Sequence, residues 1–363
     1  MATMKDIAER LGVSMSTVSK GLNGGADISE SLRQAILDTA VELGYTNSRT
    51  KKPQNRRIAV FVANMIPHDS TDLSARIILN FKQAANRDNW SIDVIESDVT
   101  FQSQHKYDTY MLQERYTGAF VLGFSLNDPW ISQFATTSIP TVLLDNFLPV
   151  NPHLCGIGTD PDEGLAAAVQ HLIHLGHEKI AFLDGSAGSM ASDMRMKAYL
   201  QALSSARLPI DPNLAVYGYF VADAAHYHVP GFLERGATAI LCGSDDIALG
   251  VIDSCEMLGY KVPEDVSVIG FDDVPKATTM TPPLSTIRQS PEELGKCGFY
   301  TLYAAINGVS VSRCLLRPAL IERSSTAICR PRAVFRRSSW IDDKDSVQHV
   351  NPELYQQFAA RRL

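Results

Sequence analysis

The sequence predicts a small head of three short helices followed by a larger body of two α/β lobes. Residues 1–46 contain three amphipathic helical segments. Residues 47–57 are polar and basic. From residue 58 onward, short apolar runs alternate with helical stretches, which is the pattern of parallel sheets covered by helices. A chain of 363 residues has room for two or three such domains.

The first two helices of the head are expected to be joined by a tight glycine turn. Ile7, Ala8 and Leu11 lie on one face of the first helix. Gly12 then ends this helix in the left-handed conformation that glycine tolerates, and Ser14 caps the second helix. Two helices joined in this way are typical of a helix-turn-helix, whose second helix enters the major groove of DNA.

A third helix is expected from about residue 30 to residue 43. Ser29 precedes it as a cap, and Ile36 and Ala40 recur at helical spacing. Gly44 ends it. Three short helices of this kind complete the predicted DNA-binding head.

Small polar and basic side chains of the head are the candidates for contacts with DNA. Met15, Ser16 and Lys20 project away from the apolar face of the second helix, toward base edges. The predicted DNA-binding residues are Thr3, Met4, Lys5, Ser14, Met15, Ser16, Thr17, Ser19, Lys20, Asn23, Ser29 and Arg33. In the alternative interpretation, the hydroxyl groups are only helix caps and Lys20 is a solvated surface charge.

The charge of the chain is unevenly distributed. Residues 1–57 carry nine Lys and Arg against six Asp and Glu, whereas the remaining 306 residues carry 24 against 34. A basic head on an acidic body indicates that only the head meets phosphate. Residues 47–57 have no apolar stripe, and we expect this linker to lie against the DNA backbone.

Two similar α/β lobes are expected between residues 58 and 330, with a ligand in the cleft of the resulting clamshell. The strand-like runs of the first lobe are 58–62, 91–95, 119–122 and 141–144. Those of the second lobe are 180–183, 239–242 and 266–270. The predicted boundaries are about 58–159 and 288–315 for lobe 1, and about 160–287 and 316–330 for lobe 2. Residues 331–363 form a tail to which the sequence assigns no role.

Ligands of open α/β sheets bind beyond the carboxyl ends of the strands, where this sequence places charged residues. Arg195, Asp245 and Asp272 all follow predicted strands of the second lobe. Asp accepts hydrogen bonds from sugar hydroxyl groups and Arg donates them, while Phe220 and Phe271 are expected to stack on a sugar ring. Alternatively, the aspartates are helix caps and the arginine forms a surface salt bridge.

The stretch from Ile7 to Asn23, I-A-x-x-L-G-V-S-x-x-T-V-S-K-x-L-N, resembles the N-terminal signature of the LacI/GalR family of bacterial repressors. Ile28-Ser29 and Leu43-Gly44-Tyr45 follow at the right distance, and Val268 to Asp273 and Pro282 to Ile287 look like later family blocks. The resemblance covers about residues 3–330. It implies a helix-turn-helix head on a body similar to periplasmic binding proteins.

The resemblance also implies roles for single residues. Met15 and Ser16 would be the main specificity positions, with Lys20 as a further base contact. Lys20 stands where the family usually has Arg, and because Lys lacks the bidentate fork of Arg, a softer base preference is expected. In the body, the predicted effector-binding residues are Asp69, Leu73, Arg195, Phe220, Ser244, Asp245, Phe271 and Asp272, with Arg76 and Glu163 as further candidates.

Two departures from the family pattern stand out. Ser244 occupies a position that is usually Asn, so the amide donor of that side chain is missing. The linker lacks the A-R-x-L core and has no Leu between Tyr45 and Ile58, so we do not expect a leucine wedge in the minor groove. Basic residues of the linker would partly replace the wedge; they are Arg49, Lys51, Lys52, Arg56 and Arg57.

The predicted function is therefore that of a transcription regulator, a repressor of carbohydrate-utilisation genes controlled by a small sugar. We expect a homodimer on a pseudo-palindromic operator, because one helix-turn-helix covers only a half-site. The alternatives are a sugar-binding clamshell without DNA regulation and an α/β enzyme acting on a sugar. No G-x-S-x-G or P-loop motif occurs, so no enzymatic activity is expected.

Several classes of protein are disfavoured. The six cysteines have no C-x-x-C spacing, and His174 and His177 lack a carboxylate partner in the pattern, so neither a metal nor another cofactor is expected. The N-terminus has no secretory pattern, and no apolar run reaches 18 residues. We therefore expect a cytoplasmic protein without a membrane partner.

Overall fold

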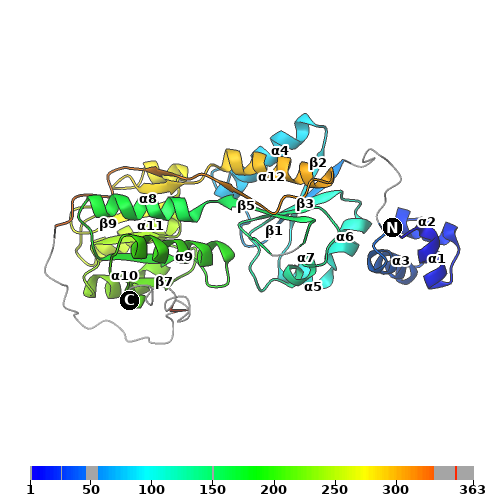
Figure 1. Cartoon of the computed structure of the whole chain (residues 1–363), viewed down its shortest axis with the longest axis horizontal. Coiled ribbons are helices and arrows are strands. Elements are labelled where there is room, and N and C mark those ends of the chain that lie inside the picture. The colour runs from blue at the N-terminus through cyan, green and yellow to red at the C-terminus, as the bar shows by residue number, and fades with distance from the viewer. Residues whose placement is uncertain (1, 26, 46–55, 149–150, 331–347, 350–363) are drawn as a thin grey trace. The chain divides into compact units, whose positions relative to one another are not determined.

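The structure is a computed structural model that describes residues 2–25, 27–45, 56–148, 151–330 and 348–349 (Figure 1). It contains two compact units. Unit 1 comprises Met1–Ile66, Ile77–Ile157 and Gly295–Cys314. Unit 2 comprises Pro67–Arg76, Gly158–Leu294 and Leu315–Leu363. Most of the predicted linker, residues 46–55, lies outside the described residues, and so do residues 331–347 and 350–363 of the tail.

The head consists of the three expected helices, α1 (Met4–Leu11), α2 (Met15–Asn23) and α3 (Glu30–Glu42). Ile7, Val18 and Ile36 are fully buried and form its core. Gly12 ends α1 with a φ of 65°, which a side chain would strain. A Cβ atom on Gly21 would lie 2.6 Å from Ile36 Cδ1, so the close packing of α2 against α3 depends on the absence of a side chain at this position.

The larger part of unit 1 is a six-stranded sheet with the order β11-β5-β4-β3-β1-β2. Its pairings from β2 to β5 are parallel, and Val60 aligns with both Val94 and Phe120. The strands are β1 (Arg57–Val62), β2 (Ser91–Glu96), β3 (Gly118–Leu122), β4 (Thr141–Leu144), β5 (Leu154–Thr159) and β11 (Arg313–Leu316). The helices are α4 (Leu73–Arg87), α5 (Val99–Gln104), α6 (Tyr107–Gln113), α7 (Pro129–Phe134) and α12 (Pro291–Ile306).

Unit 2 is built on a seven-stranded sheet with the order β12-β10-β9-β8-β6-β7-β13. The five central strands run parallel, and the edge strands β12 and β13 are antiparallel to them. The strands are β6 (Ile180–Asp184), β7 (Ala215–Tyr217), β8 (Ala239–Cys242), β9 (Ser267–Asp272), β10 (Ser285–Arg288), β12 (Ala319–Ile321) and β13 (Gln348–His349). The helices are α8 (Pro161–His174), α9 (Met190–Ser205), α10 (Ala224–Glu234) and α11 (Asp245–Met257), with short 3₁₀ turns η1 (Pro212–Leu214) and η2 (Pro275–Thr278).

The parallel strands of unit 2 bring polar residues to one edge of the sheet. Asp184 and Asp272 are the last residues of β6 and β9. Ser244 caps α11, which follows β8, and Gln289 follows β10. Because the carboxyl ends of parallel strands meet at the same edge, these four residues converge in space.

Within the described residues, no helix is long and apolar enough to span a bilayer. The same part of the chain contains no group of three or more His, Cys, Asp or Glu side chains arranged to hold a metal ion.

Candidate DNA-binding surface and effector site

Helix α2 presents the predicted base-reading side chains to solvent. Val18 is buried against the head core, whereas Ser16 and Lys20 are exposed and the Met15 side chain is 57% exposed. The same helix therefore has one face fixed by packing and another free to meet a partner. This is the arrangement that a recognition helix requires.

Lys20 already has an acidic partner in the head. Its Nζ donates to a carboxylate oxygen of Asp27, in the turn between α2 and α3. This hydrogen bond is the main reason that the pKa of Asp27 lies below its ordinary value. The sequence analysis did not identify Asp27, although its position only seven residues after Lys20, beyond a glycine turn, was the available signal.

Three of the predicted hydroxyl-bearing residues, Thr3, Ser14 and Ser29, cap the helices of the head. Backbone N–H groups of Asp6, Thr17 and Leu32 donate to the side chains of Thr3, Ser14 and Ser29, respectively. These three side chains therefore act as helix caps, as the alternative interpretation expects. They remain exposed at helix N-termini, where phosphate groups also bind well.

The remaining predicted DNA-binding residues have varied surroundings. Asn23 Nδ2 donates to the Ser19 carbonyl oxygen at 2.8 Å, and exposed Lys5 lies 3.6 Å from Glu9. Met4 is half-buried and packs on the head core, and its contact with DNA stays a prediction. Arg33 is partly buried, and a Cβ atom on Gly24 would lie 3.1 Å from its Nη2.

Arg195 lies at the centre of the polar edge of unit 2. Its side chain is 7% exposed, and Nη1 donates to the Gly243 carbonyl oxygen at 2.6 Å. The guanidinium lies 4.0 Å from the ring centroid of Phe271. Phe271 is 1% exposed and covered by Arg195, so its ring supports the guanidinium. Stacking of this ring on a ligand stays a prediction.

Asp245 is also a supporting residue. It is 1% exposed, and its two oxygens accept hydrogen bonds from the Val274 backbone at 2.9 Å and from Thr286 Oγ1 at 2.6 Å. Burial and the nearby Asp272 raise the pKa of Asp245 to about 8. Both oxygens hold the chain segments that follow β9 and form β10, and a direct effector contact of Asp245 stays a prediction.

Asp272 is held in an unusual backbone conformation. Its φ is 121°, and that of the following Asp273 is 59°, in the region that L-residues rarely adopt. Gln289 Nε2 donates to Asp272 Oδ1, and Arg288 and Arg323 pair with Asp273. Strain of this kind persists where the surroundings impose it, often at binding sites. The sequence analysis missed Gln289, which is buried beside a predicted site residue.

Asp184 is a second missed residue. It is fully buried at the end of β6, and its Oδ1 accepts a hydrogen bond from the Gly185 backbone at 2.8 Å. Its Oδ2 is buried without a hydrogen-bond partner. Burial raises the pKa of Asp184 to about 8, although the positive charge of Arg195 acts in the opposite direction.

Phe220 covers the backbone next to Asp184. The side chain is 40% exposed, and a Cβ atom on Gly185 would lie 2.0 Å from its ring. One face of the aromatic ring therefore rests on the glycine backbone. Ser244, in contrast, is buried, and its hydroxyl accepts from the Ile247 backbone as a helix cap.

The other effector candidates lie elsewhere in unit 2. Asp69 accepts from the backbone and hydroxyl of Thr71, within the turn before α4, and Leu73 begins that helix. Arg76 pairs with Glu292 at 2.8 Å. Glu163 pairs with Arg317 at 3.0 Å.

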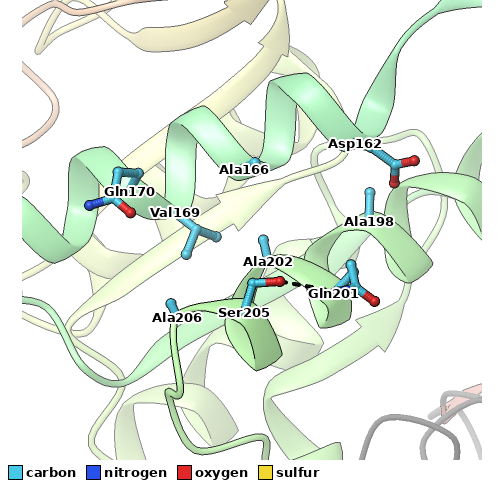
Figure 2. Close-up of a pocket in the computed structure, with 9 residues that line it drawn as sticks. All are labelled: Asp162, Ala166, Val169, Gln170, Ala198, Gln201, Ala202, Ser205 and Ala206. Carbon is cyan, nitrogen blue, oxygen red and sulfur yellow. Dashed lines mark hydrogen bonds between the residues drawn. The ribbon is translucent and has the colours of Figure 1, made fainter.

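A shallow groove lies between α8 and α9 (Figure 2). It has a volume of about 190 Å³ and is lined largely by small side chains, including Ala166, Ala198 and Ala202. None of the predicted effector residues lines it. The polar edge of the sheet is therefore the better candidate for ligand binding.

Comparisons with known proteins match both parts of the chain. A profile described as "Bacterial regulatory proteins, lacI family" matches residues 3–48, and a periplasmic binding protein-like domain matches residues 169–326. The probable HTH-type transcriptional repressor ExuR of Bacillus subtilis (strain 168) is 30% identical over 314 residues, which cover 85% of this chain and 92% of the relative. The chain belongs to the LacI family of bacterial regulatory proteins.

Other LacI-family proteins align over most of the chain. The HTH-type transcriptional repressor PurR of Vibrio atlanticus (strain LGP32) is 27% identical over 330 residues, covering 90% of this chain and 98% of the relative. Among solved structures, the regulator CelR in complex with cellobiose aligns with a TM-score of 0.68 and 26% identity, covering 90% of this chain and all of that chain. A lac repressor dimer bound to operator and the anti-inducer ONPF aligns with a TM-score of 0.65 and 25% identity, covering 90% and 99%.

Proposed function

We propose that this LacI-family protein is a cytoplasmic transcription repressor of carbohydrate-utilisation genes that binds operator DNA as a homodimer. The observation that carries the proposal is the orientation of α2. Its buried face is fixed by Val18, and its opposite face exposes Met15, Ser16 and Lys20. These are the positions at which the helix-turn-helix reads base edges. The lac repressor dimer bound to operator supports the dimeric arrangement.

A small polyhydroxylated ligand is the effector that the edge of unit 2 favours. The edge carries the buried guanidinium of Arg195 and the carboxyl groups of Asp184 and Asp272, and Phe220, 40% exposed, lies against Gly185 next to Asp184. A sugar offers alternating hydroxyl groups to such donors and acceptors, and apolar ring faces to an aromatic side chain. The cellobiose complex of CelR supports this ligand class.

The DNA-binding part of the proposal is tested by changing Lys20 to Ala. An operator would first be selected from a random duplex library with the wild-type protein and then used in gel-retardation titrations. Loss of one base contact is expected to weaken binding about 5- to 150-fold. Lys197→Ala, which removes an exposed lysine from unit 2, is the matched control and should bind as the wild type does. Failure of the wild-type protein to select any duplex would contradict the proposal.

The effector part is tested by thermal shift against a panel of mono- and disaccharides that includes cellobiose. We expect at least one sugar to raise the unfolding temperature of the wild-type protein in a concentration-dependent way. Asp272→Ala should remove the shift without affecting operator binding in the absence of sugar. If the variant shows an unchanged sugar titration, Asp272 does not belong to the site.

A further inference from the structure

Two thiols lie against each other in unit 1, outside the DNA-binding surface and the effector site. The Sγ atoms of Cys297, on α12, and Cys314, on β11, are 3.4 Å apart. Both side chains are partly exposed, whereas Cys155, Cys242 and Cys255 are buried. The two positions are 17 residues apart, so no short cysteine motif marks them in the sequence.

The two sulfur atoms are in direct non-bonded contact. A disulfide requires the two sulfur atoms at about 2.05 Å, so they must approach by about 1.4 Å. Cys297 lies in the second turn of α12 and Cys314 is the second residue of β11. The contact between the two sulfur atoms joins the helix to the strand.

The pair also has a distinctive position along the chain. The segment Gly295–Cys314 belongs to unit 1, whereas the residues before and after it belong to unit 2. Cys297 follows the point at which the chain enters unit 1, and Cys314 is the last residue before it leaves. A bond between them would therefore close this whole segment into a covalent loop.

We propose that Cys297 and Cys314 are an oxidation site at which a hydroperoxide forms a reversible disulfide. With hydrogen peroxide, the thiolate of one cysteine attacks a peroxide oxygen, so an S–O bond forms, the O–O bond breaks, and the leaving hydroxide takes up a proton as water. The thiolate of the other cysteine then attacks the sulfenic sulfur; the S–S bond forms, the S–O bond breaks, and the leaving hydroxide takes up a proton as a second water. Two thiols lose two electrons in total, and the peroxide gains them.

The surroundings of the thiols affect how readily they react. Burial and the hydrogen bond with Cys314 raise the pKa of Cys297 to about 11. The thiolate is the reactive form, so the reaction of Cys297 is slow at neutral pH. Cys155 is buried near both thiols, and burial raises its pKa to about 12, so it stays reduced.

The experiment is to treat the reduced full-length protein with hydrogen peroxide, alkylate the remaining thiols and map the peptides by mass spectrometry. We expect two of the six thiols to become inaccessible, a single cross-link between Cys297 and Cys314, and full reversal by dithiothreitol. Cys329→Ser, which removes another partly exposed thiol, should leave the cross-link intact. Cys314→Ser should abolish it.

Peptide mapping of the wild-type protein is sufficient to test the proposed disulfide, so the test does not depend on the folding of a variant. Six alkylated thiols after peroxide treatment, or a cross-link between other cysteines, would overturn the proposal. A second readout tests the loop closure: the oxidised wild type should unfold at a higher temperature than the reduced protein. Equal unfolding temperatures, with the cross-link present, would show that closing the loop does not constrain the unfolded chain. Neither measurement depends on DNA or effector binding.

Discussion

The ion pair between Lys20 and Asp27 places an acidic group on the surface that the head would present to DNA. For Lys20 to contact a base or phosphate, its ammonium must leave the carboxylate. The negative charge of Asp27 also repels the phosphate backbone, whatever the DNA sequence that the head binds. On the operator, the contact between Lys20 and a base compensates for the loss of the ion pair and for this repulsion. On a random sequence, no such base contact forms and neither cost is compensated. We therefore expect Asp27 to increase the difference between operator and non-specific affinity.

Changing Asp27 to Asn tests this expectation. The variant should bind a random-sequence 30-bp duplex several-fold more tightly than the wild type, because Lys20 is released. The slope of log affinity against log salt should steepen by about 1, as for one additional phosphate contact. Glu42→Gln, which removes the same charge from the exposed end of α3, is the control. Equal slopes for Asp27→Asn and wild type would exclude the competition.

Asp184 predicts a pH dependence of stability. Its pKa is about 8 in the folded protein and 3.8 in the reference state, so the folded chain holds a proton that the unfolded chain has lost. Between these values, the unfolded state binds fewer protons and stability must fall as pH rises, by up to about 1.4 kcal/mol per pH unit. Below pH 3.8 and above pH 8 this contribution is constant.

Asp184→Asn should remove that dependence, because the amide does not ionise. The measurement is the unfolding temperature of both proteins from pH 4 to pH 9. The advantage of the variant over the wild type should grow up to about pH 8 and then level off. A constant difference across the whole range would mean that Asp184 is already ionised in the folded protein at low pH.

At the scale of elements, the α2–α3 packing depends on Gly21. An added Cβ atom would lie 2.6 Å from Cδ1 and 3.0 Å from Cγ2 of Ile36, which is fully buried. Overpacking costs typically about 1–3 kcal/mol, and the better helix propensity of Ala offsets about 1 kcal/mol of this. We expect Gly21→Ala to increase amide hydrogen exchange in α2 and α3. Adding Ile36→Val removes the nearest methyl group and should restore protection; if it does not, the clash is not the cause.

The local signals in the sequence predicted the head better than the effector site. Caps at Thr3, Ser14 and Ser29 depend on residues three positions away, so spacing alone identifies them. The fold of the body was likewise predictable from its apolar runs. The surroundings of Asp245 were not, because its partners Val274 and Thr286 lie 29 and 41 residues away.

The same distinction explains why the packing of Phe271 was not foreseen and why Asp184 was not among the predicted site residues. Sequence spacing places both at the carboxyl ends of strands, where ligand contacts are common. Whether a side chain faces the ligand or lies beneath another residue depends on tertiary packing. Phe271 is covered by Arg195, and the Asp184 carboxyl group is so close to Gly243 that a Cβ atom there would lie 2.5 Å from Asp184 Oδ1.

At the scale of the whole molecule, the proposed function joins a DNA-binding head and an effector-binding body in one chain. If the effector changes operator affinity by some factor, the operator must change effector affinity by the same factor, because the two binding free energies are linked. We expect a factor of about 5–150. It would be measured by titrating the sugar identified by thermal shift, with and without saturating operator, and by titrating operator with and without saturating sugar.

Two variants separate coupling from binding in this experiment. Lys20→Ala should weaken operator binding with and without sugar by a similar factor, so the coupling factor stays near the wild-type value. Asp272→Ala should lose sugar binding, so operator affinity no longer depends on sugar. A wild-type coupling factor of 1 in both titrations would mean that ligand binding to the body does not change the affinity of the head for operator. The protein would then be a DNA-binding protein with an uncoupled sugar site, and the repressor proposed here would lack its control.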